Sequence, residues 1–342
     1  MSSASPRTPS AAPAPPEPPP GFTERLPRPV RAVLDSFLRP TTGSLRGWAL
    51  AGIAVNMLIA VTGATVRVTE SGLGCPEWPL CTADSLVPTG EALGTVHAFI
   101  EFGNRTLTSV VLAVALIVTI ATWRRFPGRP RLLAVALVQP AGCLGQAVVG
   151  GITVWSDLHP AAVGAHFLVS MAMLVAAVAL YVRVREGTAP AVPRVHPAAR
   201  YLGYALLLAG AAVLVAGVVT TGTGPHGGDA ASPRWPLDLH EVARVHSVLA
   251  WVTTLFAVAL LVVLYRTGAP ADTRRYGWVL IAAVAAQGVI GYVQYALALP
   301  EALVVAHVLG AIVLWVALLR LFFSLTERPE APAGAVPATA EV

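Results

Sequence analysis

The sequence predicts an all-α integral membrane protein whose eight transmembrane helices form two tandem, parallel four-helix bundle repeats. Hydrophobic residues make up 55% of the 342-residue chain and charged residues only 12%. That charged share is about half of what soluble domains carry, and the mean hydropathy is +0.68. A soluble globule needs more charge to cover its surface. The composition therefore excludes a soluble enzyme, and equally a disordered, coiled-coil or collagen-like chain.

Eight apolar stretches supply the predicted helices. Each is about 20 residues or longer, which is enough to cross roughly 30 Å of hydrocarbon as an α-helix. In chain order the stretches lie at 48–68, 94–122, 132–154, 161–182, 201–221, 241–265, 276–298 and 302–323. The segments between them are short, so consecutive helices are expected to run antiparallel.

Five parts of the chain follow from these stretches. Residues 1–46 are rich in proline and arginine and contain no apolar run long enough for a signal-peptide core, so we expect a disordered cytoplasmic tail. The N-terminal four-helix half covers 47–185. A cytoplasmic linker at 186–200 leads to the C-terminal four-helix half at 201–324. The Pro/Ala-rich tail at 325–342 is expected to be disordered.

The distribution of arginine predicts the orientation in the membrane. All 23 basic residues are arginine, and they gather before the first helix and in alternate loops. The intervening loops contain only Arg234. The positive-inside rule then places both termini in the cytoplasm and the arginine-poor loops outside the cell membrane. Because the arginines act as topology signals, the net charge of +5 does not predict a nucleic-acid partner.

Short motifs recur in the two halves at matching distances. Gln146-Ala-Val-Val-Gly150 leads to His166 twenty residues after its glutamine, and Gln287-Gly-Val-Ile-Gly291 leads to His307 at the same distance. The halves therefore read as a duplicated four-helix unit. Four helices return the chain to its starting side, so the two copies are expected to be parallel rather than inverted.

Three histidines share one predicted depth in the outer leaflet. His166, His246 and His307 lie about 7–10 Å inside the outer ends of their helices at 1.5 Å per residue. Polar groups at this depth usually face a bundle interior, and imidazoles from two helices can ligate a haem iron from both faces. A histidine that only hydrogen-bonds a helix is the structural alternative. Zinc is less favoured, because no cysteine or carboxylate stands at ligand spacing.

Glu101 is the most distinctive single residue. It lies about two turns into the second helix, with Arg105 at i+4 and His97 at i−4 on the same face. One interpretation is a structural Glu–Arg pair. The other is a carboxylate that faces a reactive centre as an electrostatic stabiliser or proton acceptor.

Two cysteines flank the first outer loop. Cys75 and Cys81 could close a disulfide in an oxidising compartment; two free thiols and a redox-active pair are the alternatives. Near the same surface, Arg67, Arg234 and Arg244 break the scarcity of arginine. Arginine pairs well with carboxylates, so haem propionates are candidate partners, with ordinary interfacial anchoring as the alternative.

The motifs together resemble the haem A synthase family. The resemblance rests on Thr69-Glu-Ser-Gly-Leu-Gly-Cys-Pro-Glu-Trp-Pro-Leu-Cys81, on Glu101-Phe-Gly-Asn-Arg105 and on the paired histidine pattern, and it covers about 48–325. It implies an oxidoreductase that converts the C8 methyl group of haem O, through an alcohol, to the formyl group of haem A for cytochrome oxidases.

The resemblance also implies roles for individual residues. Haem b would lie between His246 and His307, and the substrate haem O would use His166. Glu101 would be the catalytic glutamate, and Cys75 and Cys81 the loop disulfide. Upstream, a haem O synthase is the expected partner, alongside membrane lipid and an electron acceptor that the sequence does not identify. The oligomeric state stays open, a homo-oligomer included.

One position departs from the family pattern. Family members commonly carry Glu-x-x-His-Arg on the second helix, whereas this chain has Asn104 before Arg105. An amide is a poor iron ligand, so two-histidine ligation in the N-terminal half is in doubt. His97 lies about 10 Å from Asn104 along the helix and is not expected to replace it. His97, Asn104, Arg105, His159 and His240 are accessory candidates for the site.

Two other functions compete with this interpretation. An electron-carrying cytochrome b without porphyrin chemistry would need two complete histidine pairs, and Asn104 breaks one. A small-molecule transporter would be compatible with parallel repeats. However, the helices lack paired Gly/Pro interruptions at mid-membrane, and the polar groups gather near one face.

Overall fold

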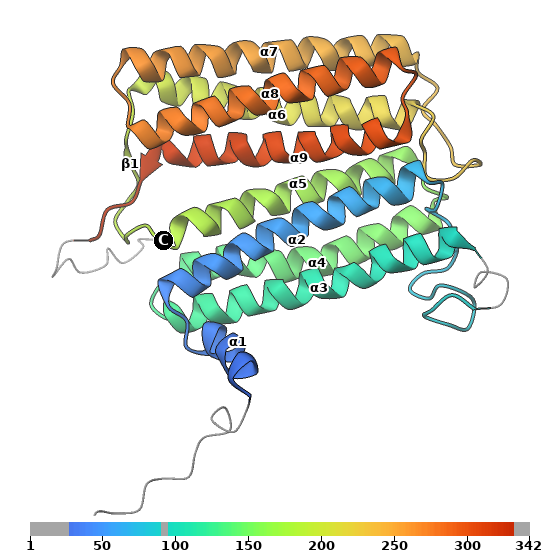
Figure 1. Cartoon of the computed structure of the whole chain (residues 1–342), viewed down its shortest axis with the longest axis horizontal. Helices are drawn as coiled ribbons and strands as arrows, with labels where there is room; N and C mark the ends of the chain where they lie inside the picture. Colours follow the sequence, from blue (N-terminus) through green and yellow to red (C-terminus); the bar gives the residue numbers. More distant parts are fainter. Residues whose placement is uncertain (1–26, 90–94, 332–342) are drawn as a thin grey trace, which may run out of the picture.

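Long apolar helices make up almost all of the chain that the structure describes. The computed structural model describes residues 27–89 and 95–331, and within these ranges it contains nine α-helices and one two-stranded sheet (Figure 1). The helices are α1 (Arg28–Leu38), α2 (Thr42–Val68), α3 (Val96–Arg125), α4 (Pro130–Trp155), α5 (Pro160–Arg183), α6 (Pro197–Thr223), α7 (Leu239–Arg266), α8 (Ala271–Ala296) and α9 (Glu301–Ser324). The strands are β1 (Val192–Pro193) and β2 (Thr326–Glu327), which pair antiparallel.

The helices α2 to α9 are each long and apolar enough to cross a membrane. They match the eight predicted stretches in order, with end points that differ by at most six residues. In hydrocarbon every backbone N–H and C=O group must be satisfied within the chain, and a helix does this along its whole length. The prediction of an all-α, multi-pass integral membrane protein is therefore confirmed.

The eight long helices form two rings of four. In the first ring α2 packs on α3, α3 on α4, α4 on α5, and α5 back on α2. The second ring repeats this order with α6, α7, α8 and α9. Figure 1 shows the two rings side by side, with α5 and α2 of the first facing α9 of the second. In each ring, the first helix is diagonal to the third, and the second is diagonal to the fourth.

A continuous apolar core joins the two rings. Buried side chains of the first ring, such as Ile53 and Leu174, belong to the same cluster as Leu260 and Leu318 of the second. The indole Nε1 of Trp315 also donates a hydrogen bond across the seam to the carbonyl of Met171 at 3.0 Å. The rings therefore have a packed common interface rather than a flexible connection.

The structure corrects the prediction that residues 1–46 form a disordered tail. Helix α1 lies within that range, and α2 begins at Thr42; residues 1–26 lie outside the described residues. Helix α1 is amphipathic, and its Phe37 packs edge-on against Trp48 of α2 with ring centroids 6.3 Å apart. A helix of eleven residues is marginal alone, so this contact explains why a short pattern among prolines is helical here.

One further segment differs from the prediction. Strand β2 lies in the tail 325–342, which was expected to be disordered, and it pairs with β1 in the linker 186–200. The strands satisfy each other's backbone groups, and Arg328 forms an ion pair with Glu186 at 3.0 Å beside them. Residues 332–342 lie outside the described part of the chain.

The bundle has two ends with different contents. At the disulfide end lie the segment 69–89, the segment 224–238 and the first turns of α3, α5, α7 and α9. At the arginine-rich end lie α1, β1, β2 and the last turns of the same four helices. The two ends are on opposite sides of Figure 1.

Candidate functional site

Two histidine side chains face each other across the second ring. His246 comes from α7 and His307 from the diagonal helix α9, with ring centroids 6.3 Å apart and ring planes at 71°. A ring nitrogen binds a transition metal at about 2 Å and lies about 1 Å from its ring centroid, so two imidazoles on one metal ion have centroids roughly 6 Å apart. The observed separation fits two axial ligands of one haem iron.

A glycine on the neighbouring helix makes room for each of these imidazoles. A methyl group at Gly217 of α6 would lie 3.2 Å from Cε1 of His246, and one at Gly291 of α8 would lie 3.1 Å from Cε1 of His307. Both distances are tighter than ordinary packing, so the close approach depends on glycine. Nδ1 of each ring is buried and has no hydrogen-bond partner among the described residues.

The first ring has one imidazole at the corresponding position. His166 of α5 lies against Gly150 of α4, where a methyl group would be 3.5 Å from Cε1. On the diagonal helix α3 stands Asn104, whose Oδ1 accepts a hydrogen bond from Oγ1 of Thr62 at 2.7 Å. The asparagine is thus engaged with α2. The first ring offers one imidazole where the second offers two.

Two glutamines from the repeated motif hold the histidine backbones. Nε2 of Gln146 donates to the carbonyl of His166 at 3.0 Å and to Oγ of Ser170 at 2.5 Å. Nε2 of Gln287 donates to the carbonyl of His307 at 2.8 Å. The motif therefore links α4 to α5, and α8 to α9, at the histidine-bearing turn.

The carboxylate of Glu101 is buried beneath the first segment of the disulfide end. Glu101 is only 6% exposed. Its Oε2 accepts a hydrogen bond from the backbone N–H of Cys75 at 2.7 Å. Its Oε1 accepts from Nε and Nη2 of Arg105 at 3.0 and 2.5 Å. The ion pair that the i+4 spacing predicts is present.

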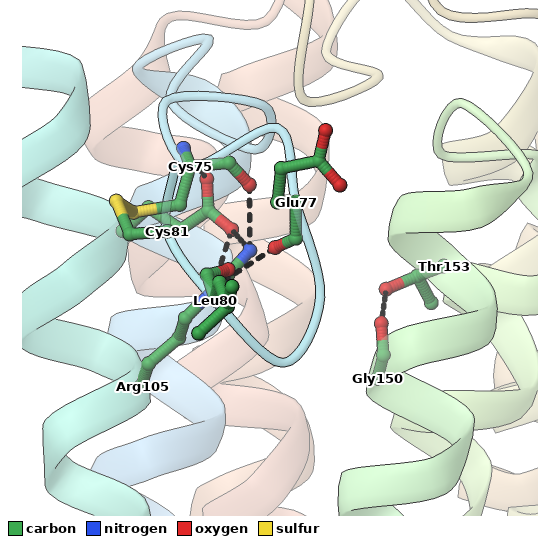
Figure 2. A network of polar contacts seen from close by, with 8 residues as sticks. Cys75, Glu77, Leu80, Cys81, Arg105, Gly150 and Thr153 are labelled. Carbon is green, nitrogen blue, oxygen red and sulfur yellow. Dashed lines mark hydrogen bonds and ion pairs between the residues drawn. A yellow bond between two sulfur atoms is a disulfide. The ribbon is translucent and has the colours of Figure 1, made fainter. Parts of the chain in front are cut away.

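Arg105 uses its other donors to hold the disulfide segment, as Figure 2 shows. Nη1 donates to the carbonyls of Glu77 and Leu80 at 2.9 and 2.8 Å, and Nη2 donates to the carbonyl of Cys75 at 2.7 Å. All five N–H groups of the guanidinium therefore have an acceptor. The Glu101–Arg105 pair fixes the segment over the first ring.

The two loop cysteines are joined. Cys75 and Cys81 form a disulfide with an S–S distance of 2.01 Å, which confirms that alternative over two free thiols. Within the segment, the indole of Trp78 lies against Gly151 of α4. Cys143 is a buried free cysteine in α4.

The three arginines predicted for propionates differ in how they are engaged. Arg67 donates to the carbonyl of Thr221 at 2.6 Å, across the seam, and its Nε is buried without a partner in the part of the chain described. Arg234 donates to the carbonyls of Gly224, Pro225, Asp229, Ser232 and Pro233 and so organises its own loop. Arg244 pairs with Glu241 on an exposed face. Of the three, Arg67 is the one with a buried N–H group that a ligand could still bind.

The accessory histidines lie nearer the end of the bundle. Nδ1 of His97 is 3.0 Å from Oγ of Ser71. His159 caps α5 by accepting from the N–H of Ala161 at 3.3 Å. Nδ1 of His240 is 2.7 Å from the hydroxyl of Tyr295. Each of these three imidazoles therefore already has a polar partner.

Sequence reasoning missed Thr62 and the roles of the small residues in the repeated motif. Gln146 and Gln287, with Gly150 and Gly291, stood out as repeat markers without an assigned contact. Their recurrence at a fixed distance from a histidine was the signal that could have identified them. Thr62 gave no such signal, because its partner lies 42 residues away.

Comparison with known proteins gives one family and several relatives. The family model described as "Cytochrome oxidase assembly protein" (COX15-CtaA) matches residues 46–319. The chain is 28% identical over 131 residues to a protein named heme A synthase from Geobacillus thermodenitrificans, covering 37% of this chain and 40% of that one.

Two further relatives carry the same name. The Halalkalibacterium halodurans protein is 30% identical over 152 residues, which is 44% of this chain and 49% of the relative. The Lysinibacillus sphaericus protein is 31% identical over 143 residues, or 42% of this chain and 45% of the relative. The chain thus spans about half the length of the curated relatives it matches.

Proposed function

Because the chain belongs to the COX15-CtaA family of cytochrome oxidase assembly proteins, we propose that it acts as a haem A synthase. The reaction oxidises the C8 methyl group of haem O to an alcohol and then to the formyl group of haem A. The overall change takes one oxygen atom from water and releases four electrons and four protons. An external electron acceptor is therefore required.

The unequal histidine content of the two rings carries this proposal. The imidazoles of His246 and His307 are spaced as two ligands of one metal ion would be. In the first ring, α3, the helix diagonal to that of His166, carries Asn104, which is bonded to Thr62. An electron carrier with a haem in each half would be expected to hold both between two histidines. A site with two histidine ligands suits a resident haem. A site with one histidine leaves a coordination position on the iron free, which suits a haem that is the substrate.

We assign the resident haem b to His246 and His307. When bound there, haem b would supply one-electron transfer. The chain's own contribution is to orient both imidazoles. Gly217 and Gly291 let these imidazoles lie against the neighbouring helices, and Gln287 holds the backbone of His307. Arg67, with its buried unpaired Nε, is the best placed of the three arginines to meet a propionate.

We assign the substrate to the first ring, with His166 as the ligand of its iron. Glu101 is the proposed catalytic carboxylate. Oxidation at the methyl carbon builds positive character, which a preorganised buried carboxylate would stabilise. Arg105 and the N–H of Cys75 would hold that carboxylate in one orientation. His97, Asn104, His159 and His240 would act around the site without binding iron.

Glu101 also fixes the disulfide segment, so its test must separate two roles. Glu101→Gln removes the charge and keeps the size of the side chain. Arg105→Gln removes the three bonds to the segment's carbonyls and keeps the carboxylate. A catalytic carboxylate predicts at least a hundredfold loss of haem A for Glu101→Gln, with bound haem b and disulfide protection from mild reductant both retained. If the two variants lose activity and disulfide protection in parallel, Glu101 is structural only.

Location and partners form part of the same proposal. The clustered arginines favour a cell-membrane protein with both termini in the cytoplasm and the disulfide end outside. A haem O synthase would supply the substrate. Fusion of a reporter that is active only in the cytoplasm should give signal at the C-terminus and none within the segment 82–89; the opposite pattern would overturn this orientation.

The decisive experiment is haem extraction. The full chain is expressed with a haem O synthase in a host that lacks haem A, and the extracted haems are separated with mass detection. Haem A, or the hydroxylated intermediate, supports the proposed function. Protein-bound haem b with unchanged haem O, in the presence of added electron acceptors, supports the cytochrome b alternative. A protein without any haem would refute the histidine assignments.

A further inference from the structure

A cavity of about 190 Å³ lies in the seam between the two rings at the arginine-rich end. Its walls come from α2 and α5 of the first ring, from α8 and α9 of the second, and from the segments around β1 and β2. At about 30 Å³ per water molecule the space holds roughly six waters. It lies at the opposite end of the bundle from the histidines.

Two arginines in this cavity have no acidic partner. Nη2 of Arg46 donates to the hydroxyl of Tyr181, and Nη2 of Arg320 donates to that of Tyr276, both at 2.7 Å. Both guanidinium groups also stack on the ring of Tyr181, at 4.5 and 5.3 Å from its centroid. Neither forms an ion pair within residues 27–89 and 95–331. Nε of Arg46 is buried and has no partner in the same ranges.

The two acids that line the cavity are already paired with other arginines, one of which, Arg194, also lines the cavity. Asp272 binds Arg194 at 3.1 Å, and Glu186 binds Arg328 at 3.0 Å. Stacking on tyrosine attracts a cation, but it does not neutralise the charge. Two like charges stacked on the same tyrosine ring repel each other in a partly dehydrated space. An anion bound by both guanidinium groups would remove that cost.

The tyrosines add donors to the same space. Tyr181 and Tyr276 accept a hydrogen bond from an arginine, so the single hydrogen of each hydroxyl is free to be donated to a ligand. Arg46 lies four residues after the start of α2 and Arg320 four before the end of α9, which places both about 6 Å inside the helix ends. That depth corresponds to the boundary between hydrocarbon and lipid headgroups.

We propose that this cavity binds a phosphate group, supplied by the headgroup of an anionic phospholipid. The guanidinium groups of Arg46 and Arg320 would bind its oxygens, as arginine does in bidentate contacts with phosphate, and the two tyrosine hydroxyls would complete the set of donors. Basic pockets between transmembrane helices at the positively charged membrane face are known to suit such headgroups. Because its walls come from both rings, a bound headgroup would stabilise the seam. This inference is independent of the proposed reaction.

The test measures lipid-dependent stability of the full chain. The protein is delipidated in a neutral detergent, and its unfolding temperature is followed by tryptophan fluorescence against phosphatidylglycerol, phosphatidylcholine or inorganic phosphate. We expect a saturable rise with phosphatidylglycerol and none with phosphatidylcholine. The double variant Arg46→Gln/Arg320→Gln should need at least about tenfold more phosphatidylglycerol for half of the effect. The control Arg274→Gln should respond as the wild type, because Arg274 stacks on Tyr265 outside the cavity.

The outcomes separate the sources of the phosphate. If inorganic phosphate protects the wild type but not the double variant, and phosphatidylglycerol adds nothing, the site takes free phosphate and the lipid assignment is overturned. An equal response of the double variant and the wild type would refute the site. Should the double variant not fold, native mass spectrometry of the wild type replaces it: retained phosphatidylglycerol in excess of phosphatidylcholine supports the proposal, and no such excess overturns it.

Discussion

The two rings of this molecule share one helix arrangement but differ in the side chains that face their centres. In the second ring, Gly217 is the twenty-first residue of α6 and Gly291 is the twenty-first of α8. These glycines lie against His246 and His307, respectively. In this ring a small residue at one fixed helix position is matched, on the next helix, by an imidazole.

In the first ring, the pair α4 and α5 has the same contact between a glycine and an imidazole, whereas the pair α2 and α3 does not. Gly150 is the twenty-first residue of α4 and lies against His166. At the twenty-first position of α2 stands Thr62, and it bonds Asn104 instead of making room for an imidazole. Thr62 thus stands where the second ring has the smaller glycine, and Asn104 stands where it has the larger histidine. The two polar side chains form a hydrogen bond with each other. The first ring is therefore a well-packed site for one imidazole rather than a damaged site for two.

The largest expected effect comes from removing the histidines themselves. His246→Ala or His307→Ala should abolish bound haem b, because either change leaves one axial ligand. His166→Ala should leave haem b intact and lower haem A production by at least about a hundredfold. Absorption spectra of the purified protein measure the first quantity and haem extraction the second. Loss of haem b from His166→Ala would contradict the division of labour between the rings.

A second change would make the first ring resemble the second. Thr62→Gly/Asn104→His restores both members of the replaced pair, so we expect the substrate haem to become six-coordinate and low-spin. Closure of the open iron position should lower the rate of haem A formation on the order of tenfold. Electron paramagnetic resonance of the haem O-loaded protein detects the new ligand. Asn104→His alone is the control: Thr62 then occupies the required space, so a low-spin signal from the single variant would contradict the coupling.

The glycines allow a finer comparison with a matched pair of variants. Gly291→Ala places a methyl group 3.1 Å from Cε1 of His307, whereas Gly150→Ala places one 3.5 Å from Cε1 of His166. The first distance requires the imidazole to move and the second is ordinary contact. We expect Gly291→Ala to weaken haem b binding several-fold and Gly150→Ala to leave haem A formation near the wild-type rate. Haem titration of the purified apoprotein and haem extraction measure these effects; equal sensitivity would show that the rings have the same tolerance.

The sequence predicts one side of this comparison better than the other. Hydropathy and arginine placement predict the eight helices because membrane solvation acts on each helix alone. The depth of His246 and His307 follows from helix rise, and their pairing is what the family resemblance implies. The Thr62–Asn104 bond and the hydrogen bond from the backbone N–H of Cys75 to Glu101 were not predictable, because both join groups that meet only in the folded bundle. Helix α1 was missed for the same reason, since it is stabilised by packing on α2 and α3.

The smallest expected effect concerns the glutamines that hold the histidine backbones. Gln146→Leu removes two hydrogen bonds, to the carbonyl of His166 and the hydroxyl of Ser170, whereas Gln287→Leu removes one, to the carbonyl of His307. At about 1 kcal/mol for each bond, Gln146→Leu should lower the free energy of unfolding more. Gln287→Leu should instead shift the midpoint potential of haem b, because only the second ring orients a resident ligand through this contact. Denaturant unfolding and redox titration of both variants test the assignment together. If the potential of haem b shifts for Gln146→Leu rather than for Gln287→Leu, the two rings have been assigned in the wrong order.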